Sequence, residues 1–262
     1  MSTARNTSAH TGVRPPLAGR TALVTGALGA IGSAIVDDLG AAGASIGLHH
    51  LGQSDEAARR VAELRDRGIR AHAVEADVRD WDRAAAMVSE LEDELGPVEI
   101  LVNNAGYMTP AGFTEMSLEE WQRTIDVDLT GVFVCSRQVV PGMARRGGGV
   151  IVNVSSQLAF KGARDYTSYC AAKAGVIGLT RAMARELGPA IRVNAVAPGP
   201  VDTPFIAPWA TEEWRTERTR DLVTGRLAEA REVAPAVTFL ASPGGSLLHG
   251  QTLHINGGGV MA

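Results

Sequence analysis

Residues 21–32 have the sequence TALVTGALGAIG, in which an apolar, strand-like run ends in a glycine-rich turn that leads into a helical pattern. A strand, a glycine turn and a helix in this order let the backbone approach a pyrophosphate, whose charge lies on the free amides of the helix N-terminus. Glycine-rich turns also occur at junctions that bind no phosphate and in sites for other nucleotide-like ligands. The turn alone therefore leaves its ligand open, and its candidate contact residues are Gly26, Leu28, Gly29, Ile31 and Gly32.

The rest of the chain repeats this alternation of short strand-like runs with longer helical patterns. The strand-like runs lie at residues 21–25, 45–50, 71–75, 100–103, 150–155, 191–197 and 251–255. Helical periodicity occurs at residues 31–39, 54–67, 81–95, 117–126, 129–146, 168–187 and 231–240. Such alternation indicates a parallel sheet covered by helices. Because no internal repeat or linker divides the chain, the sequence predicts a single α/β domain with a seven-stranded, parallel, doubly wound sheet and helices on both faces.

Composition and charge argue against several classes of protein. The chain has 262 residues, a formal net charge of −4 and a pI near 5.9, so no basic surface points to nucleic acid or to an anionic membrane. No apolar run approaches the ~20 residues that a transmembrane helix requires. Cys135 and Cys170 are too few for a disulfide scaffold, and no Cys or His spacing suggests a metal site. We therefore expect a cytoplasmic protein with two reduced thiols and no metal.

Two segments differ from the regular alternation. Residues 1–17 are polar and lack the apolar core of a secretory signal, so we expect a flexible N-terminal leader before a domain at residues 18–262. Residues 200–227 form a long stretch that contains several prolines together with Phe205, Trp209 and Trp214. Loops of this length are often lids or binding elements, although a surface excursion with incidental aromatic residues would have the same composition. We expect a substrate loop or lid at this segment.

Tyr169 and Lys173 are separated by one turn of a predicted helix, so their side chains share one face. An unperturbed tyrosine has a pKa of about 10 and is a poor base at neutral pH, but a neighbouring cation favours the phenolate. The chain contains only three tyrosines and two lysines, which makes this spacing a poor candidate for coincidence. The pair is therefore a candidate for acid–base catalysis.

Polar residues follow three of the predicted strands at their carboxyl ends, where open α/β sheets bind ligands. Asp77 and Val78 follow the third strand, the run 103–106 (Asn-Asn-Ala-Gly) ends the fourth, and Ser155 and Ser156 end the fifth. Each of these positions would also suit an ordinary turn, because Ser, Asn, Asp and Gly are favoured in turns. Their recurrence at successive strand ends favours one shared ligand site.

Together these motifs resemble those of the short-chain dehydrogenase/reductase family, over essentially residues 17–259. The matching features are the glycine turn, Asp77, the Asn-Asn-Ala-Gly run, Ser156 thirteen residues before Tyr169, Lys173, the segment 198–204 and a last strand that ends at residues 256–258. The resemblance implies a Rossmann fold and an NAD(P)-dependent oxidoreductase that transfers hydride between a nicotinamide cofactor and a ketone or secondary alcohol. The most similar members are 3-oxoacyl-(acyl-carrier-protein) reductases and sugar or polyol dehydrogenases, and the sequence does not choose between them.

The resemblance also implies roles for individual residues. Tyr169 would exchange a proton with the substrate oxygen, Lys173 would stabilise the phenolate and hold the nicotinamide ribose, and Ser156 would hydrogen-bond the substrate oxygen. Gln157 and Phe205 are expected to contact the substrate as well. Besides the glycine turn, Tyr169 and Lys173, the expected cofactor contacts are His50, Asp77, Val78, Asn104, Ala105, Gly106, Pro198, Gly199, Val201 and Thr203.

Two positions depart from the pattern of the family. Ala30 stands where the middle glycine of Thr-Gly-x-x-x-Gly-x-Gly is usual, so one methyl group enters the turn. Asp128 stands where the family has a catalytic asparagine, whose backbone carbonyl holds a water that leads to the lysine. Either the Asp128 carboxylate acts on the Tyr169–Lys173 pair, or its side chain points away and the carbonyl alone acts. The sequence leaves both open, and Asp128 stays among the catalytic candidates.

The cofactor, the assembly and the rival functions complete these expectations. NADP(H) is favoured over NAD(H), because His50 lies at the end of the second strand, where NAD enzymes commonly place Asp or Glu. The resemblance implies a homotetramer that acts on a small-molecule ketone or alcohol.

One alternative function is that of a cofactor-binding regulatory or scaffold protein on the same fold, which the retained Tyr169 and Lys173 disfavour. The other is a methyltransferase with a nucleoside ligand, which leaves the Asn-Asn-Ala-Gly run unexplained.

Overall fold

The computed structural model describes residues 14–261, and its strands form one parallel sheet. In chain order the strands are β1 (Thr21–Val24), β2 (Ser45–His50), β3 (Ala71–Glu75), β4 (Val98–Asn103), β5 (Gly149–Val154), β6 (Ile191–Pro198) and β7 (Thr252–Ile255). They lie side by side in the order β3-β2-β1-β4-β5-β6-β7, and every neighbouring pair is parallel. This confirms the predicted seven-stranded Rossmann sheet.

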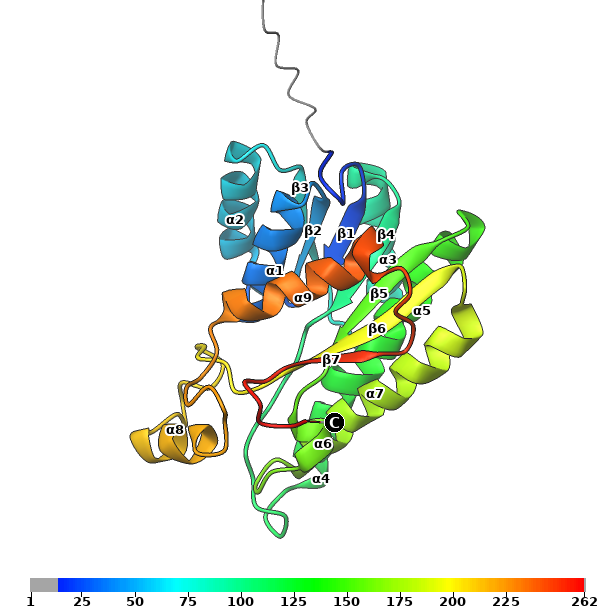
Figure 1. The fold of residues 1–262 in the computed structure, drawn as a ribbon. Coiled ribbons are helices and arrows are strands. Elements are labelled where there is room, and N and C mark those ends of the chain that lie inside the picture. The colour runs from blue at the N-terminus through cyan, green and yellow to red at the C-terminus, as the bar shows by residue number, and fades with distance from the viewer. Residues whose placement is uncertain (1–13, 262) are drawn as a thin grey trace, which may run out of the picture.

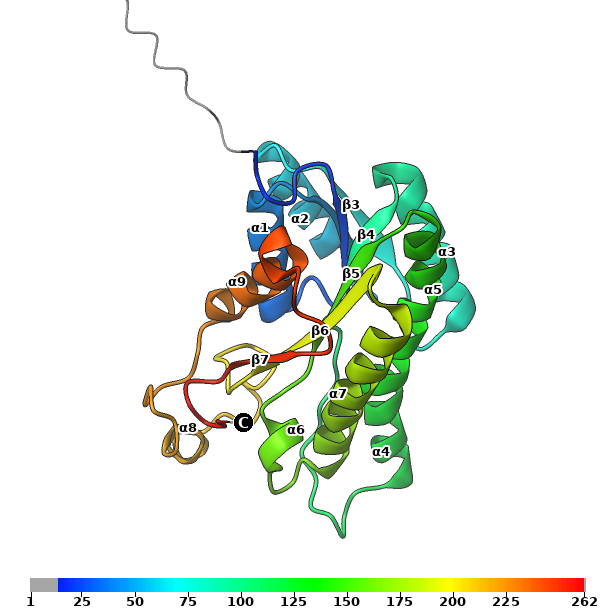
Figure 2. The same ribbon diagram turned by 45° about the vertical axis from the view of Figure 1, so that its right-hand side comes forward.

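Helices cover both faces of the sheet (Figures 1 and 2). One face carries α1 (Ala30–Ala41), α2 (Ser54–Asp66) and α9 (Ala230–Ala241), and the other carries α3 (Trp81–Leu95), α5 (Gly131–Arg145) and α7 (Thr167–Leu187). Each face has its own apolar core, with Leu39 and Leu48 fully buried in the first and Leu91 and Leu101 in the second. Because the central strands are buried on both faces, their sequences are continuously apolar and do not alternate.

The remaining helical elements lie near the carboxyl edge of the sheet, except for one short turn that follows α9 in the chain. They are α4 (Leu118–Ile125), the π-helix η1 (Asp126–Thr130), α6 (Leu158–Lys161), α8 (Glu212–Thr219) and the 3₁₀ turn η2 (Pro243–Gly245). α4, η1 and α5 follow one another without a break, so the two helices predicted at 117–126 and 129–146 are parts of one helical run. Single π turns inside such runs are frequent at functional sites. α6 and α8 are short, and the sequence pattern did not predict them.

The N-terminal boundary of the domain differs from the prediction. Leu17 is fully buried against the first core, and its N–H donates to the carbonyl oxygen of Ala42 at 2.9 Å. The expected leader at residues 1–17 was therefore wrong at its end, because Leu17 gains burial and a backbone hydrogen bond in the packed domain. Residues 1–13 lie outside the part of the chain that the structure describes.

The order of the strands creates a crevice at one edge of the sheet. The chain leaves β1 toward β2 and leaves β4 toward β5, so the connections after these adjacent strands run in opposite directions. Ligands of doubly wound sheets bind at the carboxyl ends of the strands beside such a switch point. The glycine turn follows β1, the Asn-Asn-Ala-Gly run ends β4 and Ser155–Ser156 follows β5, so all three predicted motifs lie at this edge.

A chain of buried hydrogen bonds joins the sheet to α5 and α7. Asn103 on β4 donates through Nδ2 to Asn153 Oδ1 on β5 at 2.8 Å and to Ser136 Oγ on α5 at 3.0 Å. Asn153 in turn donates to Thr180 Oγ1 on α7 at 2.9 Å. An unpaired buried polar group costs roughly 1–3 kcal/mol. These three hydrogen bonds therefore help to hold α7, which carries Tyr169 and Lys173, against the sheet.

Residues 200–227, the predicted substrate segment, leave the sheet after β6. They contain α8, which projects beyond the sheet in Figure 1 on the same side as α6. Within residues 14–261 we find no helix with both the length and the apolar character needed to cross a membrane.

Candidate active site

The glycine turn between β1 and α1 has no room for side chains at two positions. Gly26 has a φ of +62°, and a Cβ there would lie 2.9 Å from the Cα of Ala105. A Cβ at Gly32 would lie 2.2 Å from the carbonyl oxygen of Gly26. The first amides of α1 have no acceptor within the helix, and the helix dipole places positive charge at this end. The close-packed turn and the free amides fit a phosphate group.

Asn104 and Thr25 hold the two halves of the crevice together. The Nδ2 group of Asn104 donates to the carbonyl oxygens of Thr25 at 2.9 Å and Gly26 at 3.0 Å. In return, Thr25 Oγ1 accepts from the backbone N–H groups of Asn104 at 2.9 Å and Ala105 at 3.0 Å. These four bonds fix the Asn-Asn-Ala-Gly run beside the glycine turn, so both contribute to one wall.

His49, which the sequence analysis did not select, forms a hydrogen bond with the glycine turn. The Nδ1 atom of His49 accepts the N–H of Gly26 at 3.0 Å, and its Nε2 lies 2.9 Å from the carbonyl oxygen of Ala76. Because a carbonyl only accepts, the proton lies on Nε2 and the ring is neutral. Burial lowers the pKa of His49, which favours this state. His50, the residue expected to contact the cofactor, is also buried, and its Nδ1 accepts the N–H of Gln53 at 3.4 Å.

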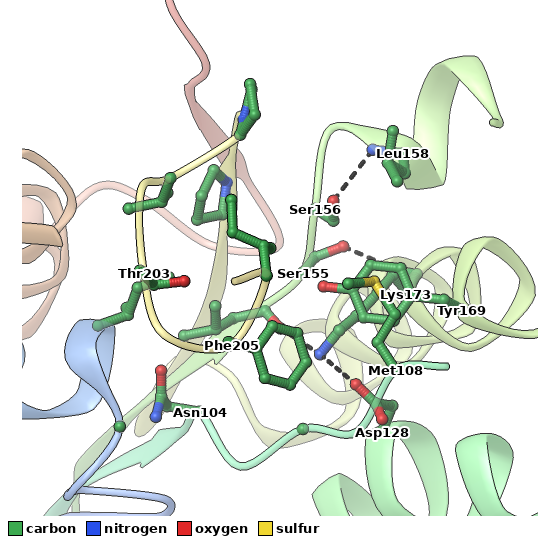
Figure 3. A pocket seen from close by; sticks show the side chains of 18 of the residues that line it. Asn104, Met108, Asp128, Ser155, Ser156, Leu158, Tyr169, Lys173, Thr203 and Phe205 are labelled. Carbon is green, nitrogen blue, oxygen red and sulfur yellow. Dashed lines mark hydrogen bonds and ion pairs between the residues drawn. The ribbon is translucent and has the colours of Figure 1, made fainter. Parts of the chain in front are cut away.

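Tyr169 and Lys173 lie on α7 and point toward the residues that end β5 (Figure 3). The Nζ atom of Lys173 lies 5.5 Å from the centroid of the Tyr169 ring. Ser155 Oγ donates to the carbonyl oxygen of Lys173 at 2.9 Å and so ties α7 to β5 at this point. Ser156 Oγ accepts the N–H of Leu158 at 3.1 Å, and Ser156 lines the same cavity as Tyr169. The predicted Ser–Tyr–Lys constellation is therefore assembled.

Asp128 lies on the π-helix η1, and its side chain points at Lys173 (Figure 3). Its Oδ1 atom is 2.9 Å from Lys173 Nζ, and its Oδ2 atom accepts the N–H of Tyr107 at 2.8 Å. Lys173 Nζ also donates to the carbonyl oxygen of Val154 at 3.1 Å. An ammonium has three N–H donors, so one remains for a ligand. Of the two readings that the sequence left open, the one with the side chain turned away is wrong.

The environment shifts the pKa values of all three groups. Burial raises the pKa of Tyr169, the charge of Lys173 opposes this shift, and the charge of Asp128 adds to it. For Lys173, burial alone would lower the pKa, but the charges of Asp128 and Tyr169 outweigh it and the pKa is raised. Burial also raises the pKa of Asp128, against the opposing effect of Lys173. The proton affinity of Tyr169 thus depends on the balance of one cation and one carboxylate.

A cavity of about 300 Å³ opens over these groups and extends to the glycine turn. Of the residues proposed from sequence, it brings together Gly26, Gly29, Ile31, Gly32, Asn104, Ala105, Gly106, Asp128, Ser156, Gln157, Tyr169, Lys173, Pro198, Gly199, Val201, Thr203 and Phe205. At its far end, residues of the segment after β6 pack on a small apolar cluster of Met108, Tyr166 and Ile206. The cavity therefore joins the glycine turn, the group of Ser156, Tyr169 and Lys173, and a partly apolar end.

Comparison with known proteins identifies the family. A family model described as enoyl-(acyl carrier protein) reductase matches residues 26–259. This span contains the glycine turn, the strand-end residues, Tyr169 and Lys173. The chain belongs to the short-chain dehydrogenase/reductase family.

Relatives of this short-chain dehydrogenase/reductase match along nearly their whole length. The cis-4-hydroxycyclohexanecarboxylate dehydrogenase of Sinomonas cyclohexanicum is 42% identical over 242 residues, which are 91% of this chain and 96% of the relative. The 3-oxoacyl-[acyl-carrier-protein] reductase of Staphylococcus aureus is 37% identical over 244 residues, 91% of this chain and 97% of the relative. The crystal structure of a gluconate 5-dehydrogenase from Burkholderia cenocepacia in complex with NADP and tartrate gives a TM-score of 0.88 at 31% identity, covering 94% of this chain and 96% of that one.

Membership fixes the reaction class. This short-chain dehydrogenase/reductase is an NAD(P)-dependent oxidoreductase that acts on the CH–OH/C=O pair of a secondary alcohol and a ketone.

Ala30, the departure from the family's glycine turn, is the first residue of α1 and lines the cavity. A Cβ at Gly29 would have only ordinary contact, 3.5 Å from the Gly26 carbonyl oxygen. Packing therefore leaves room only for glycine at positions 26 and 32, whereas position 29 could hold a Cβ.

Four of the expected cofactor residues do not line the cavity: Leu28, His50, Asp77 and Val78. The carboxylate of Asp77 accepts hydrogen bonds from the guanidinium of Arg79 at 2.6–3.1 Å. Val78 is buried and packs against Gly131, where an added Cβ would lie 2.8 Å from the Cγ2 atom of Val78. Conversely, sequence reasoning did not assign Tyr166, Ile206 or Arg218 to the site, although all three line it. Only the length and aromatic content of the segment after β6 hinted at such residues.

Proposed function

We propose that this enzyme reduces a small ketone, and oxidises the corresponding secondary alcohol, with Tyr169 as the general acid–base. The observation that carries the proposal is that the half-buried Tyr169 and the buried pair Lys173–Asp128 lie together at the wall of one cavity. During reduction the Tyr169 hydroxyl donates its proton to the oxygen of the substrate. During oxidation the phenolate takes the proton from the alcohol, and the charge of Lys173 favours this phenolate.

Ser156 orients the substrate oxygen. Its Oγ atom accepts the N–H of Leu158, which fixes the oxygen while the O–H remains able to donate. A carbonyl oxygen that accepts from both Ser156 and Tyr169 is polarised and held for proton transfer. Gln157 and Phe205 line the same part of the cavity, and we place the rest of the substrate against them.

The residues present fit a dinucleotide cofactor. A pyrophosphate would lie on the free amides of α1 at Ile31 and Gly32, against the turn residues Gly26 and Gly29, and Gly26 and Gly32 have no room for a Cβ. The remaining N–H of Lys173 would hold the nicotinamide ribose. Pro198, Gly199, Val201 and Thr203 would border the nicotinamide, which supplies or accepts the hydride when bound. Asn104, Ala105 and Gly106 would line the adenosine side, with Leu28, His50, Asp77 and Val78 around the adenine end.

We favour NADP(H) over NAD(H). No carboxylate stands at the end of β2, where His50 is found, so a 2′-phosphate would meet no like charge from that residue. The similar gluconate 5-dehydrogenase was solved in complex with NADP, which supports the same choice.

We also propose a homotetrameric enzyme of the cytoplasm. By analogy with the family, the proposed contacts between subunits would involve α5, α7 and β7, and the free thiols Cys135 and Cys170 suit a reducing compartment. Light scattering at micromolar concentration tests the assembly, and a monomer would contradict it.

The direct test of the reaction is a coupled screen of both directions. Purified enzyme is supplied with NADPH and a panel of aliphatic, cyclic and acidic ketones, and with NADP⁺ and the matching alcohols. We expect cofactor turnover with at least one ketone and its own alcohol, and the loss of this turnover in Tyr169→Phe. Turnover that persists in that variant would reject Tyr169 as the acid–base.

A further inference from the structure

Arg218 is the charged residue beside the apolar cluster of Met108, Tyr166 and Ile206 in the cavity. It lies on α8, in the segment after β6, and lines the same cavity as Ser156 and Tyr169. Its guanidinium carbon lies 4.9 Å from the centroid of the Tyr166 ring and 5.5 Å from that of Trp214. Two aromatic faces therefore hold the guanidinium, and such stacking leaves the in-plane N–H donors available.

Those donors have no partner in the part of the chain that the structure describes. Arg218 forms no ion pair or side-chain hydrogen bond within residues 14–261, and its Nε atom is buried without an acceptor. Arg215, one turn earlier on the same helix, pairs with Asp202 at 2.9 Å. Arg218 as a whole is half-buried, but its Nε–H can only donate, so leaving this buried donor without an acceptor is costly. The Nε–H group of Arg218 can therefore donate to a ligand in the cavity.

The charges that line the cavity point to the sign of this acceptor. Besides Arg218, the charged lining residues are Asp128 and Lys173, which pair with each other. The cavity thus has one uncompensated positive charge, close to the apolar side chains of Met108 and Ile206. An anionic group on a partly apolar ligand fits these surroundings.

We propose that Arg218 binds the carboxylate of the substrate, so that the enzyme acts on oxo acids and the corresponding hydroxy acids. The inference rests on the proposed function and names the substrate class of that same site. A single planar guanidinium matches a carboxylate through two parallel hydrogen bonds. A phosphate dianion would call for a second cation, and among the described lining residues the other cation, Lys173, is already paired.

The kinetic test compares an oxo acid with its uncharged ester in matched variants. The probes are 4-oxopentanoate and methyl 4-oxopentanoate with NADPH. Arg218→Met removes the charge but keeps an apolar stem between Tyr166 and Trp214, and Arg218→Lys restores a charge without the planar fork. Arg220→Met is the control, because Arg220 follows α8, is exposed and does not line the cavity.

Wild type should prefer the acid over the ester. Arg218→Met should lower kcat/KM for the acid by about 10- to 100-fold, mainly through KM, as expected for the loss of a charged hydrogen bond. The ester should change by less than ~3-fold, Arg218→Lys should recover part of the loss, and Arg220→Met should match wild type. An equal loss for acid and ester would show that Arg218 only holds the segment in place, and would overturn the proposal.

A binding experiment tests the role of Arg218 independently of catalytic turnover. Cyclohexanecarboxylate and cyclohexanecarboxamide are titrated against the enzyme with NADP⁺, with tryptophan fluorescence as the readout because Trp214 lies beside Arg218. Tighter binding of the carboxylate in wild type, lost in Arg218→Met, supports the inference even if no ketone is turned over. Equal binding of both probes overturns it, and so does a variant that loses affinity for NADPH instead.

Discussion

The carboxylate of Asp128 and the ammonium of Lys173 form a fully buried ion pair, with 2.9 Å between Oδ1 and Nζ. The pair lies on two different elements, the π-helix η1 and the helix α7. Breaking a buried pair by removing one charge leaves the other uncompensated, which is strongly unfavourable. The pair therefore fixes the distance between η1 and α7 and also sets the electrostatic potential at Tyr169.

The pH dependence of oxidation should report this potential. The charge of Asp128 raises the pKa of Tyr169 and that of Lys173 lowers it, so Asp128→Asn should lower the pKa of Tyr169. Alcohol oxidation requires the phenolate, which forms as pH rises through this pKa. The rising limb of kcat/KM for oxidation should therefore move to lower pH in the variant.

Asp126→Asn is the matched control for this change. Asp126 belongs to the same π-helix, but its carboxylate accepts from Gln122 at 2.8 Å and does not line the cavity. Its pH profile should coincide with that of wild type. A profile that is equally unmoved in Asp128→Asn would leave Asp128 with a structural role only.

Removal of the Tyr169 hydroxyl should separate chemistry from binding. Tyr169→Phe keeps the ring but loses the proton that is exchanged with the substrate, and loss of a general acid costs about 10²–10⁴-fold in rate. We expect kcat to fall by this factor while the affinity for NADPH, measured by fluorescence titration, stays nearly unchanged. A residual rate within a few-fold of wild type would reject the assigned role.

The glycine turn offers a test of the cofactor site that does not depend on turnover. Gly32→Ala places a Cβ 2.2 Å from the Gly26 carbonyl oxygen and 2.8 Å from Asn104 Nδ2, so the backbone of the turn must shift. We expect the affinity for NADPH to fall by at least ~10-fold, because pyrophosphate binding depends on the position of these amides. Gly178→Ala on α7 is the control, since no atom lies within 4 Å of its new methyl group. Equal affinities in the two variants would argue against the turn as the phosphate site.

Cofactor choice should depend on the residue at the end of β2. Wild type should have a higher kcat/KM with NADPH than with NADH, and His50→Asp should reverse the order by introducing a charge that repels a 2′-phosphate. We expect the NADPH value to fall by ~10-fold or more in the variant. A tenfold preference of the wild type for NADH would contradict the choice of NADP(H).

The sheet and the catalytic constellation could be predicted because local sequence encodes them. The seven strands of the structure differ from the predicted runs by two residues or fewer at each end, since strands buried on both faces leave continuous apolar runs. The spacing of Tyr169 and Lys173 fixes their common face once α7 is a helix. Polar residues at strand ends meet at one edge in any parallel sheet, so their proximity followed from the fold class.

The contacts that depend on packing between distant segments could not be predicted. Residues 117–120 (Ser-Leu-Glu-Glu) have the spacing of a reciprocal capping box, and the Ser117 side chain does accept the N–H of Glu120 at 3.1 Å. The Glu120 carboxylate, however, accepts from the hydroxyl of Tyr107 at 3.1 Å. Arg218 was missed for the same reason, because its stacking on Tyr166 joins positions far apart in the chain and leaves no periodic signal.

The segment after β6 has a consequence for how the two ligands bind. It lines the cavity with Val201 and Thr203 on the proposed nicotinamide side, and a few residues later with Phe205 and Ile206 on the substrate side. One short stretch of backbone thus borders both proposed sites, so we expect the affinities of the two ligands to be coupled. Thermodynamic reciprocity requires that the factor by which a carboxylate ligand changes cofactor affinity equal the factor by which the cofactor changes carboxylate affinity.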